Sequence, residues 1–126
     1  MRLLLDTVSF IWAIGSPQRL SRAALAALEP AKVVIEISAI SLSEIAIKQA
    51  RGKLNLQHES VFVAIQDLKL RVLPYTARHA RQLFGLPLHH ADPFDRQIIA
   101  QALAENIPVV TPDEKFSLYK GLNVIW

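Results

Sequence analysis

The sequence predicts an α/β fold, in which a central parallel sheet of four to five short strands is flanked by helices on both faces within one domain, residues 1–126. Short runs that are apolar at nearly every position recur along the chain, as expected of strands covered on both faces. Longer stretches with helical character separate these runs. Strands that alternate with helices in this way are typical of a parallel sheet.

Glycine, proline and capping residues divide the first half of the chain into elements. Gly15 and Pro17 end the first predicted helix, while Ser21 can cap the second helix and Pro30 terminates it. The run Arg51-Gly52-Lys53 places cations and a glycine at the end of the third helix, where both are favoured. The predicted order is a strand over residues 2–5, a helix over 7–14, a helix over 21–28, a strand over 33–35 and a helix over 38–50.

Similar signals divide the second half. Thr76 can cap one helix, and Asp92 can cap the most regular helix of the chain, with Pro93 at its first position. The predicted order is a helix over residues 60–70, a strand over 71–73, a helix over 76–84, a loop over 85–88, a helix over 92–105, a strand over 109–111 and a strand over 124–125.

Composition limits the class of protein. The 126 residues are 52% hydrophobic, which is ample for the core of one compact domain. The chain has no cysteine, which excludes disulfides and thiolate metal sites and fits a reducing compartment. No apolar stretch approaches the roughly 18 residues of a membrane span, and Asp6 interrupts the first apolar run too early for a signal peptide. We therefore expect a cytoplasmic protein with no membrane association.

Aspartates stand where predicted strands end and predicted helices begin. Asp6 follows the first strand, Asp113 follows the strand that ends at Thr111, and Asp95 lies in the first turn of the helix that begins at Asp92. Ligand sites of parallel sheets form beyond the carboxyl ends of the strands, so we expect these carboxylates to converge there.

Glu44 lies inside a predicted helix, between apolar positions that include Ile40 and Ile45. A carboxylate on such a helix needs a partner if it is buried, and a cation would supply one. Clustered carboxylates without thiolates favour the hard cations Mg²⁺ and Mn²⁺. The chemistry expected of such a centre is metal-dependent hydrolysis of a phosphodiester.

Helix capping is the alternative explanation for each aspartate. Asp92 is a good N-cap, Asp6 can cap the helix that follows it, and Asp113 can cap or occupy a turn. Asp95 is less well explained, since Glu or Gln is usual at the third helical position of a capping box. Taken together, the capping explanations require three independent caps at one edge of the sheet.

Other functional signals are weaker. The chain has neither a Gly-rich phosphate loop nor a nucleophile elbow. The pair His89-His90 lacks metal-ligand spacing to a third residue, so we interpret it as polar loop residues near the mouth of the site. The net charge of +3 suits a phosphate-rich partner, especially if the acids cluster and leave the remaining surface more basic, although a solvated surface explains the same charge.

Four blocks, which span nearly the whole chain, carry a family resemblance. They are Leu4-Leu5-Asp6-Thr7 with Trp12 downstream; residues 38–48 followed by Gly52-Lys53-Leu54; residues 88–96 (LHHADPFDR) leading into Ile99-Ala100-Gln101-Ala102; and Thr111-Pro112-Asp113 with Phe116 and Tyr119. With these blocks the chain resembles the PIN-domain ribonucleases, and in particular the VapC-type toxins of prokaryotic toxin–antitoxin pairs.

The resemblance implies the PIN fold and a Mg²⁺- or Mn²⁺-dependent endoribonuclease, the toxin of a type II toxin–antitoxin system, which hydrolyses RNA with a metal-activated water. It also implies a homodimer and a cognate VapB-type antitoxin. The residues it implicates are the catalytic and metal-binding quartet Asp6, Glu44, Asp95 and Asp113, the further acid Asp92, which either assists or only caps, and the supporting hydroxyls of Thr7 and Thr111. The candidates for contact with RNA are Lys48, Arg51, Lys53 and Arg96, with solvation of a helix end as the alternative for the first three.

One position departs from the family pattern. Val8 stands where His is common in this subgroup. That histidine is not one of the four acids, all of which are present, so the chain does not resemble an inactive copy. Two alternative functions remain: a catalytically silent PIN-like module that binds RNA or a protein, and a structure-specific DNA nuclease with the same metal chemistry.

Overall fold

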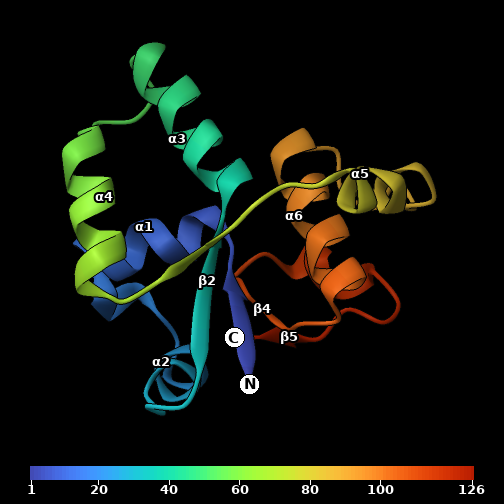
Figure 1. The fold of residues 1–126 in the computed structure, drawn as a ribbon, viewed down its shortest axis with the longest axis horizontal. Coiled ribbons are helices and arrows are strands. Elements are labelled where there is room, and N and C mark those ends of the chain that lie inside the picture. Colours follow the sequence, from blue (N-terminus) through green and yellow to red (C-terminus); the bar gives the residue numbers. More distant parts are fainter.

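A parallel sheet of five strands, in the order β3-β2-β1-β4-β5, forms the centre of the computed structural model, which describes residues 1–126 (Figure 1). The prediction of an α/β fold with a central parallel sheet is confirmed, because every neighbouring pair of strands is parallel. The strands are β1 (Arg2–Leu5), β2 (Val34–Ser38), β3 (Arg71–Leu73), β4 (Val109–Val110) and β5 (Val124–Ile125).

Helices cover both faces of this sheet. In Figure 1, α1, α2 and α4 lie on one side of the strands, and α5 and α6 lie on the other. The helices are α1 (Thr7–Gly15), α2 (Arg22–Leu28), α3 (Ala39–Ala50), α4 (His58–Asp67), α5 (Ala77–Phe84) and α6 (Pro93–Glu105), with short 3₁₀ helices over Pro17–Arg19 and Glu114–Leu118. None of the helices has the length and apolar composition that crossing a membrane requires.

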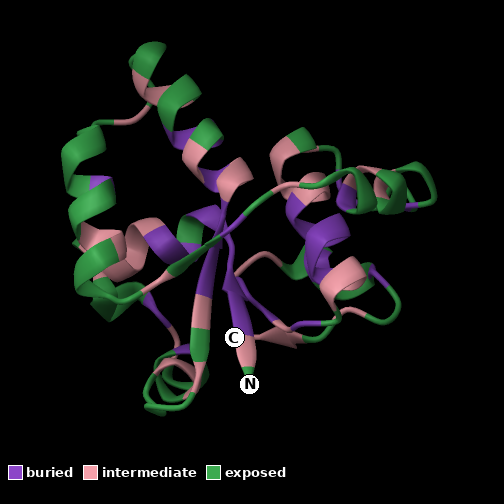
Figure 2. Ribbon diagram, in the orientation of Figure 1, coloured by how far each residue is buried: buried purple, intermediate pink, exposed green.

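The central strand β1 divides its side chains between two hydrophobic cores. Leu3 and Leu5 pack with Phe10 of α1 on one face, while Leu4 packs with Ile98 of α6 on the other. Figure 2 shows the middle of the sheet and the inner side of α6 as buried. Burial of each leucine contributes roughly 1.5–3 kcal/mol, so the strand that delivers Asp6 to the edge of the sheet is firmly held.

Strand β2 is longer than predicted, because it continues through two buried polar residues. Glu36 accepts hydrogen bonds from Arg2 and Arg71 on the neighbouring strands, and Ser38 donates to Gln101 of α6. These partners are distant in sequence, so a local pattern does not reveal that residues 36–38 can be strand.

The other differences lie at element ends. The helix predicted over residues 60–70 is α4, which begins earlier and ends at Asp67; Lys69 then has a left-handed backbone (φ 54°) and turns the chain toward β3. The two 3₁₀ helices were not predicted.

The carboxyl ends of β1 and β4 form the edge that matters for function. Leu5 pairs with Val110, so the next residues, Asp6 and Thr111, are neighbours across the two strands. The backbone N–H of Asp6 donates to the carbonyl oxygen of Val110 (3.1 Å). The strand order reverses direction between β1 and β4, and ligand sites of open α/β sheets form in the crevice at such a point.

Candidate metal centre

Asp6 is buried at the carboxyl end of β1, where hydrogen bonds hold both of its oxygens. Its Oδ1 accepts from the backbone N–H of Ser9 (2.8 Å), which caps α1, and its Oδ2 accepts from Oγ1 of Thr111 (2.6 Å). Burial raises the pKa of Asp6, the hydrogen bonds from Thr111 and Ser9 oppose that rise, and the charge of Asp113 adds to it. Hydrogen bonds therefore fix the orientation of this carboxylate, but none of these partners carries a positive charge to balance its own.

Asp113 lies beside Asp6 because Thr111 connects them. The Oγ1 of Thr111 accepts from the backbone N–H of Asp113 (3.0 Å) while it donates to Asp6. The Oδ1 of Asp113 accepts from the backbone N–H of Lys115 (2.9 Å) and caps the 3₁₀ helix Glu114–Leu118. Its Oδ2 accepts from Nε2 of His90 (2.7 Å).

The start of α6 supplies two further acids. Oδ1 of Asp92 accepts from the backbone N–H groups of Phe94 (2.8 Å) and Asp95 (3.1 Å), so Asp92 is the N-cap of this helix. Asp95 lies in the first turn, and its Oδ2 is 3.1 Å from Nε2 of His90. The capping interpretation of Asp92 is confirmed, whereas its contribution to metal binding stays a prediction.

Glu44 of α3 is buried and only half satisfied. Its Oε2 pairs with Nζ of Lys48 (2.5 Å), while its Oε1 is buried without a hydrogen-bond partner. Glu36 shows the contrast, because that carboxylate is also fully buried, yet both of its oxygens are paired with arginines. An unpartnered buried oxygen is costly, and a bound cation would satisfy it.

The acids lie close enough to act on one another, since ligand atoms of Asp95, Asp113 and His90 lie within 4.8 Å of one another. The pKa of Asp95 is raised from 3.8 to about 8, first by burial and then by the charges of Asp92, Glu44, Asp6 and Asp113. These carboxylates come from four parts of the chain and act on one another at short range. Their oxygen-only donor set fits a hard divalent cation, with Mg²⁺ and Mn²⁺ as the natural candidates.

In the absence of a divalent cation, we expect the chain to lose stability as the pH rises from about 4 toward about 8. Because the pKa of Asp95 is raised from 3.8 to about 8 in the folded chain, the folded state binds more protons than the unfolded state in this interval. The free energy of unfolding then falls as the pH rises, and the stability present below the unfolded pKa is lost. Glu105, whose pKa is lowered from 4.5 chiefly by the hydrogen bond with His79, acts only at lower pH.

Calorimetric melting of EDTA-treated protein across this interval measures the effect. The melting temperature should decline with pH, and Mg²⁺ should reverse the decline. A profile that stays flat, or that rises toward pH 8, would contradict the raised pKa of Asp95.

Two substitutions of Asp92 separate capping from metal binding. Asparagine is as good an N-cap as aspartate, so Asp92→Asn should leave stability nearly unchanged, whereas Asp92→Ala should cost about 1 kcal/mol. If Asp92 only caps α6, Asp92→Asn also keeps the Mg²⁺ affinity of the unchanged chain. Chemical denaturation and Mg²⁺ titration of both variants measure the two roles, and an Asp92→Asn variant that binds Mg²⁺ much more weakly would make Asp92 a ligand.

The supporting threonines take different positions. Thr111 hydrogen-bonds directly to Asp6, as expected of a supporting residue. Thr7 is also buried, but its Oγ1 donates to Oγ of Ser41 (2.8 Å), so it ties α1 to α3. Val8, at the departure from the family pattern, is exposed.

The candidates for contact with RNA also divide. Lys48 pairs with Glu44 inside the centre, whereas Arg51 and Lys53 are exposed beyond the end of α3. Arg96 donates to the carbonyl oxygens of Pro87 (2.9 Å) and Leu86 (3.3 Å), so its guanidinium holds the loop before α6. A role for these cations in binding RNA stays a prediction.

His90 is the residue of the centre that the sequence did not disclose. It is 6% exposed and touches two of the four acids, whereas the sequence suggested a polar loop residue at the mouth of the site. The available signal was its position two residues before Asp92, inside the most specific family block. The neighbouring His89 is exposed, as a loop residue should be.

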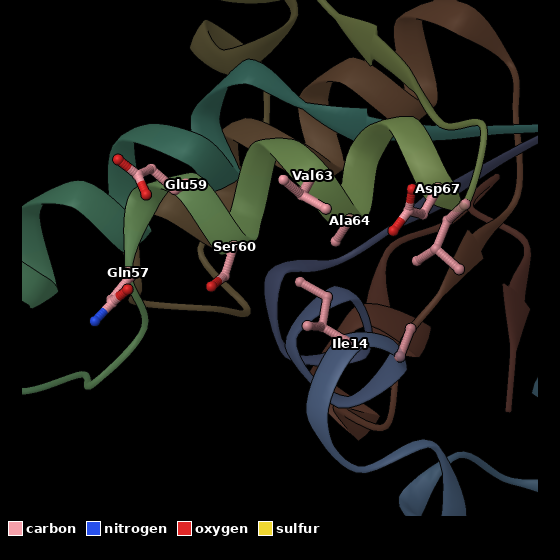
Figure 3. A pocket seen from close by; sticks show the side chains of 9 residues that line it. Ile14, Gln57, Glu59, Ser60, Val63, Ala64 and Asp67 are labelled. Carbon is pink, nitrogen blue, oxygen red and sulfur yellow. The ribbon is translucent and has the colours of Figure 1, made fainter.

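A groove of about 500 Å³ lies elsewhere, between α1 and α4. Figure 3 shows Ile14 of α1 facing Val63 and Ala64 of α4, with Glu59 and Asp67 near the two ends of that helix. None of the clustered acids lines this groove, so cavity size does not mark the candidate centre.

Comparisons with known proteins agree with the fold. A family model described as the PIN domain matches residues 3–122. VapBC2 from Rickettsia felis, bound to a promoter DNA fragment, is 21% identical, with 98% of this chain and 97% of that chain covered and a TM-score of 0.76. VapBC-5 from Mycobacterium tuberculosis, described as a member of a toxin–antitoxin family, is 19% identical, with 98% and 97% covered and a TM-score of 0.64. At these identities, the similarity to solved structures shows a shared fold and nothing more. No curated protein matches the chain.

Proposed function

The chain belongs to the PIN domain family, and from this premise we propose that it is a metal-dependent endoribonuclease, the toxin of a type II toxin–antitoxin pair. The main support is geometric: Asp95 and Asp113 both meet His90, and Thr111 joins Asp113 to Asp6 at the carboxyl edge of the sheet. The unpartnered Oε1 of Glu44 supports it, because that atom lacks what a cation would provide.

The residues of the centre have separate tasks in this proposal. A divalent cation held by the four acids would act as a Lewis acid toward water and a phosphodiester oxygen. Asp6 and Asp113 are oriented for this by hydrogen bonds to both of their oxygens. Asp95, with its raised pKa, would have to be deprotonated to hold a cation, so metal affinity should increase with pH up to about 8.

RNA is the proposed substrate, because the chain combines an acidic centre with a net charge of +3. Arg51 and Lys53 are exposed beyond the helix that carries Glu44, and cations in such positions bind phosphates and make affinity depend on salt. An RNA substrate also agrees with the expected cytoplasmic location.

The partner in this proposal is a VapB-type antitoxin, and the chain acts as a homodimer. The support comes from the family and from similar folds whose structures are described as VapBC assemblies. A small upstream gene for a protein with a DNA-binding N-terminus would favour this proposal.

Cleavage of matched single-stranded RNA and DNA, with Mg²⁺ and with EDTA, tests the activity. The unchanged chain should cut RNA only with Mg²⁺, and Asp6→Ala and Asp95→Ala should not cut it. Asp67→Ala is the matched control, since Asp67 is an exposed aspartate of α4 outside the centre, and it should keep full activity.

Each alternative has its own outcome in this assay. A catalytically silent module would bind RNA or an antitoxin without metal-dependent turnover. A DNA nuclease would cut DNA in preference to RNA. Cleavage of RNA that survives both EDTA and the two substitutions would end the proposal.

A further inference from the structure

Several contacts hold the imidazole of His90 in one orientation within the candidate centre. Its ring lies edge-on to Phe116, with centroids 5.8 Å apart and planes at 83°. Its backbone N–H donates to the hydroxyl of Tyr119 (2.9 Å), and its side chain is nearly buried. A histidine ring held in this way has a fixed orientation, so each ring nitrogen keeps the same partners.

The two ring nitrogens of His90 have different partners, and these identify the tautomer. Nδ1 lies 3.2 Å from the backbone nitrogen of Asp92, whose N–H donates to it. Because Nδ1 accepts, the proton of the neutral ring is on Nε2. Nε2 lies 2.7 Å from Oδ2 of Asp113 and 3.1 Å from Oδ2 of Asp95, so the ring offers both carboxylates a donor.

We propose that His90 is a positioning residue, which directs its Nε2–H to Asp113 and Asp95 and leaves coordination of the cation to the carboxylates. This inference rests on the proposed metal centre and adds a role that the four acids do not fill. Direct ligation of a cation through Nε2 would require the ring proton to be on Nδ1. Two donors, that proton and the backbone N–H of Asp92, would then face each other.

The position of His90 explains how Asp113 and Asp95 are held close together before a cation is bound. Oδ1 of Asp113 accepts from the backbone N–H of Lys115, and its Oδ2 accepts from Nε2 of His90. Rotation of this carboxylate is therefore restricted from both sides. The shared N–H also offsets the repulsion between Asp95 and Asp113. Partners of this kind orient metal-binding groups, and their loss typically lowers metal affinity about 10- to 100-fold.

Magnetic resonance of the unchanged chain, labelled with ¹⁵N-histidine, tests the tautomer. Mg²⁺ is diamagnetic, so the ring can be observed with and without metal at a pH near 8, around the pKa of about 8 of Asp95. We expect Nε2 to carry the proton and Nδ1 to be bare in both states. An Nε2 that loses its proton when Mg²⁺ is added, or a ring protonated on Nδ1, would overturn the inference.

Calorimetric Mg²⁺ titration of variants tests the positioning. His90→Ala should bind Mg²⁺ about 10- to 100-fold more weakly, and His90→Gln, whose amide offers a donor in place of Nε2–H, should recover part of that loss. His89→Gln is the matched control at the adjacent exposed histidine and should bind as the unchanged chain does. Thermal melting checks that each variant is folded. If His90→Ala does not fold, the resonance experiment on the unchanged chain still tests the role of His90.

The outcomes separate this inference from the proposed function. If the unchanged chain binds no Mg²⁺, both fail. If the unchanged chain binds Mg²⁺ and a folded His90→Ala binds it equally well, only the role of His90 fails.

Discussion

Asp95→Asn is expected to slow metal-dependent cleavage of RNA severely while it makes the metal-free chain more stable near pH 8. Both effects have one cause. The structure opposes the ionisation of Asp95, since burial and the charges of its neighbours raise its pKa to about 8. Asparagine removes that unfavourable charge and also removes one of the proposed ligands of the cation.

The size of the catalytic effect follows from the metal's part in the reaction. Loss of a direct ligand should slow cleavage roughly 1,000-fold, or about 4 kcal/mol in the activation free energy. The shape of the side chain is preserved, and the backbone N–H of Asp95 can still donate to Asp92. The fold should therefore survive, and the fall of the melting temperature with pH should become shallower.

Single-turnover cleavage and melting of the EDTA-treated protein measure the two halves of this prediction. Asp67→Asn supplies the same chemical change at an exposed site and should alter neither. A variant at position 95 that keeps its cleavage rate, or that becomes less stable without metal near pH 8, would contradict the account.

Glu44→Gln is expected to weaken Mg²⁺ binding by at least the factor of about 10 to 100 that loss of an orienting partner costs, and to leave the fold intact. The carboxylate is buried with Oε1 unpartnered, so the metal-free chain already bears the cost of an unsatisfied oxygen that a cation would relieve. Glutamine keeps the shape and removes the charge. The substitution also breaks the ion pair with Lys48, which is partly exposed and contributes little to stability.

Lys48 provides the control for this effect. Lys48→Gln removes the cation that pairs with Glu44, so Mg²⁺ affinity should not fall, although binding of RNA should weaken. Mg²⁺ titration of the two variants beside the unchanged chain gives the comparison. A Glu44→Gln titration curve that matches the unchanged chain would remove Glu44 from the set of ligands.

Capping and metal binding are compatible roles in this structure, although the sequence presented them as alternatives. Asp6 and Asp113 each use Oδ1 to cap a helix, and each directs Oδ2 to a second partner. The cap fixes the rotation of the carboxylate. Three caps at one edge of the sheet are therefore a way of orienting several carboxylates toward one point.

The fold, and the placement of Asp6, Asp95 and Asp113 at strand ends and helix starts, were predictable because their signals are local. The apolar run before Asp6, and the Asp92-Pro93 start of α6, identify strand ends and helix starts without knowledge of the partners. Parallel topology then brings those ends to the same edge.

The rest depends on contacts between distant parts of the chain. Glu36 is acceptable in a buried strand only because Arg2 and Arg71, which are 34 and 35 residues away, reach it. His90 belongs to the centre because Oδ2 of Asp113, which is 23 residues away, accepts a hydrogen bond from its Nε2. No sequence pattern around these residues encodes their partners.

The most direct test of the central claim is the cleavage rate of one RNA measured against free Mg²⁺, in parallel with calorimetric Mg²⁺ binding by the same protein. We expect the rate to saturate over the concentrations at which the centre fills, and we expect Asp6→Asn to show neither binding nor cleavage. Cleavage that continues in EDTA, or that is independent of whether the centre is filled, would contradict it.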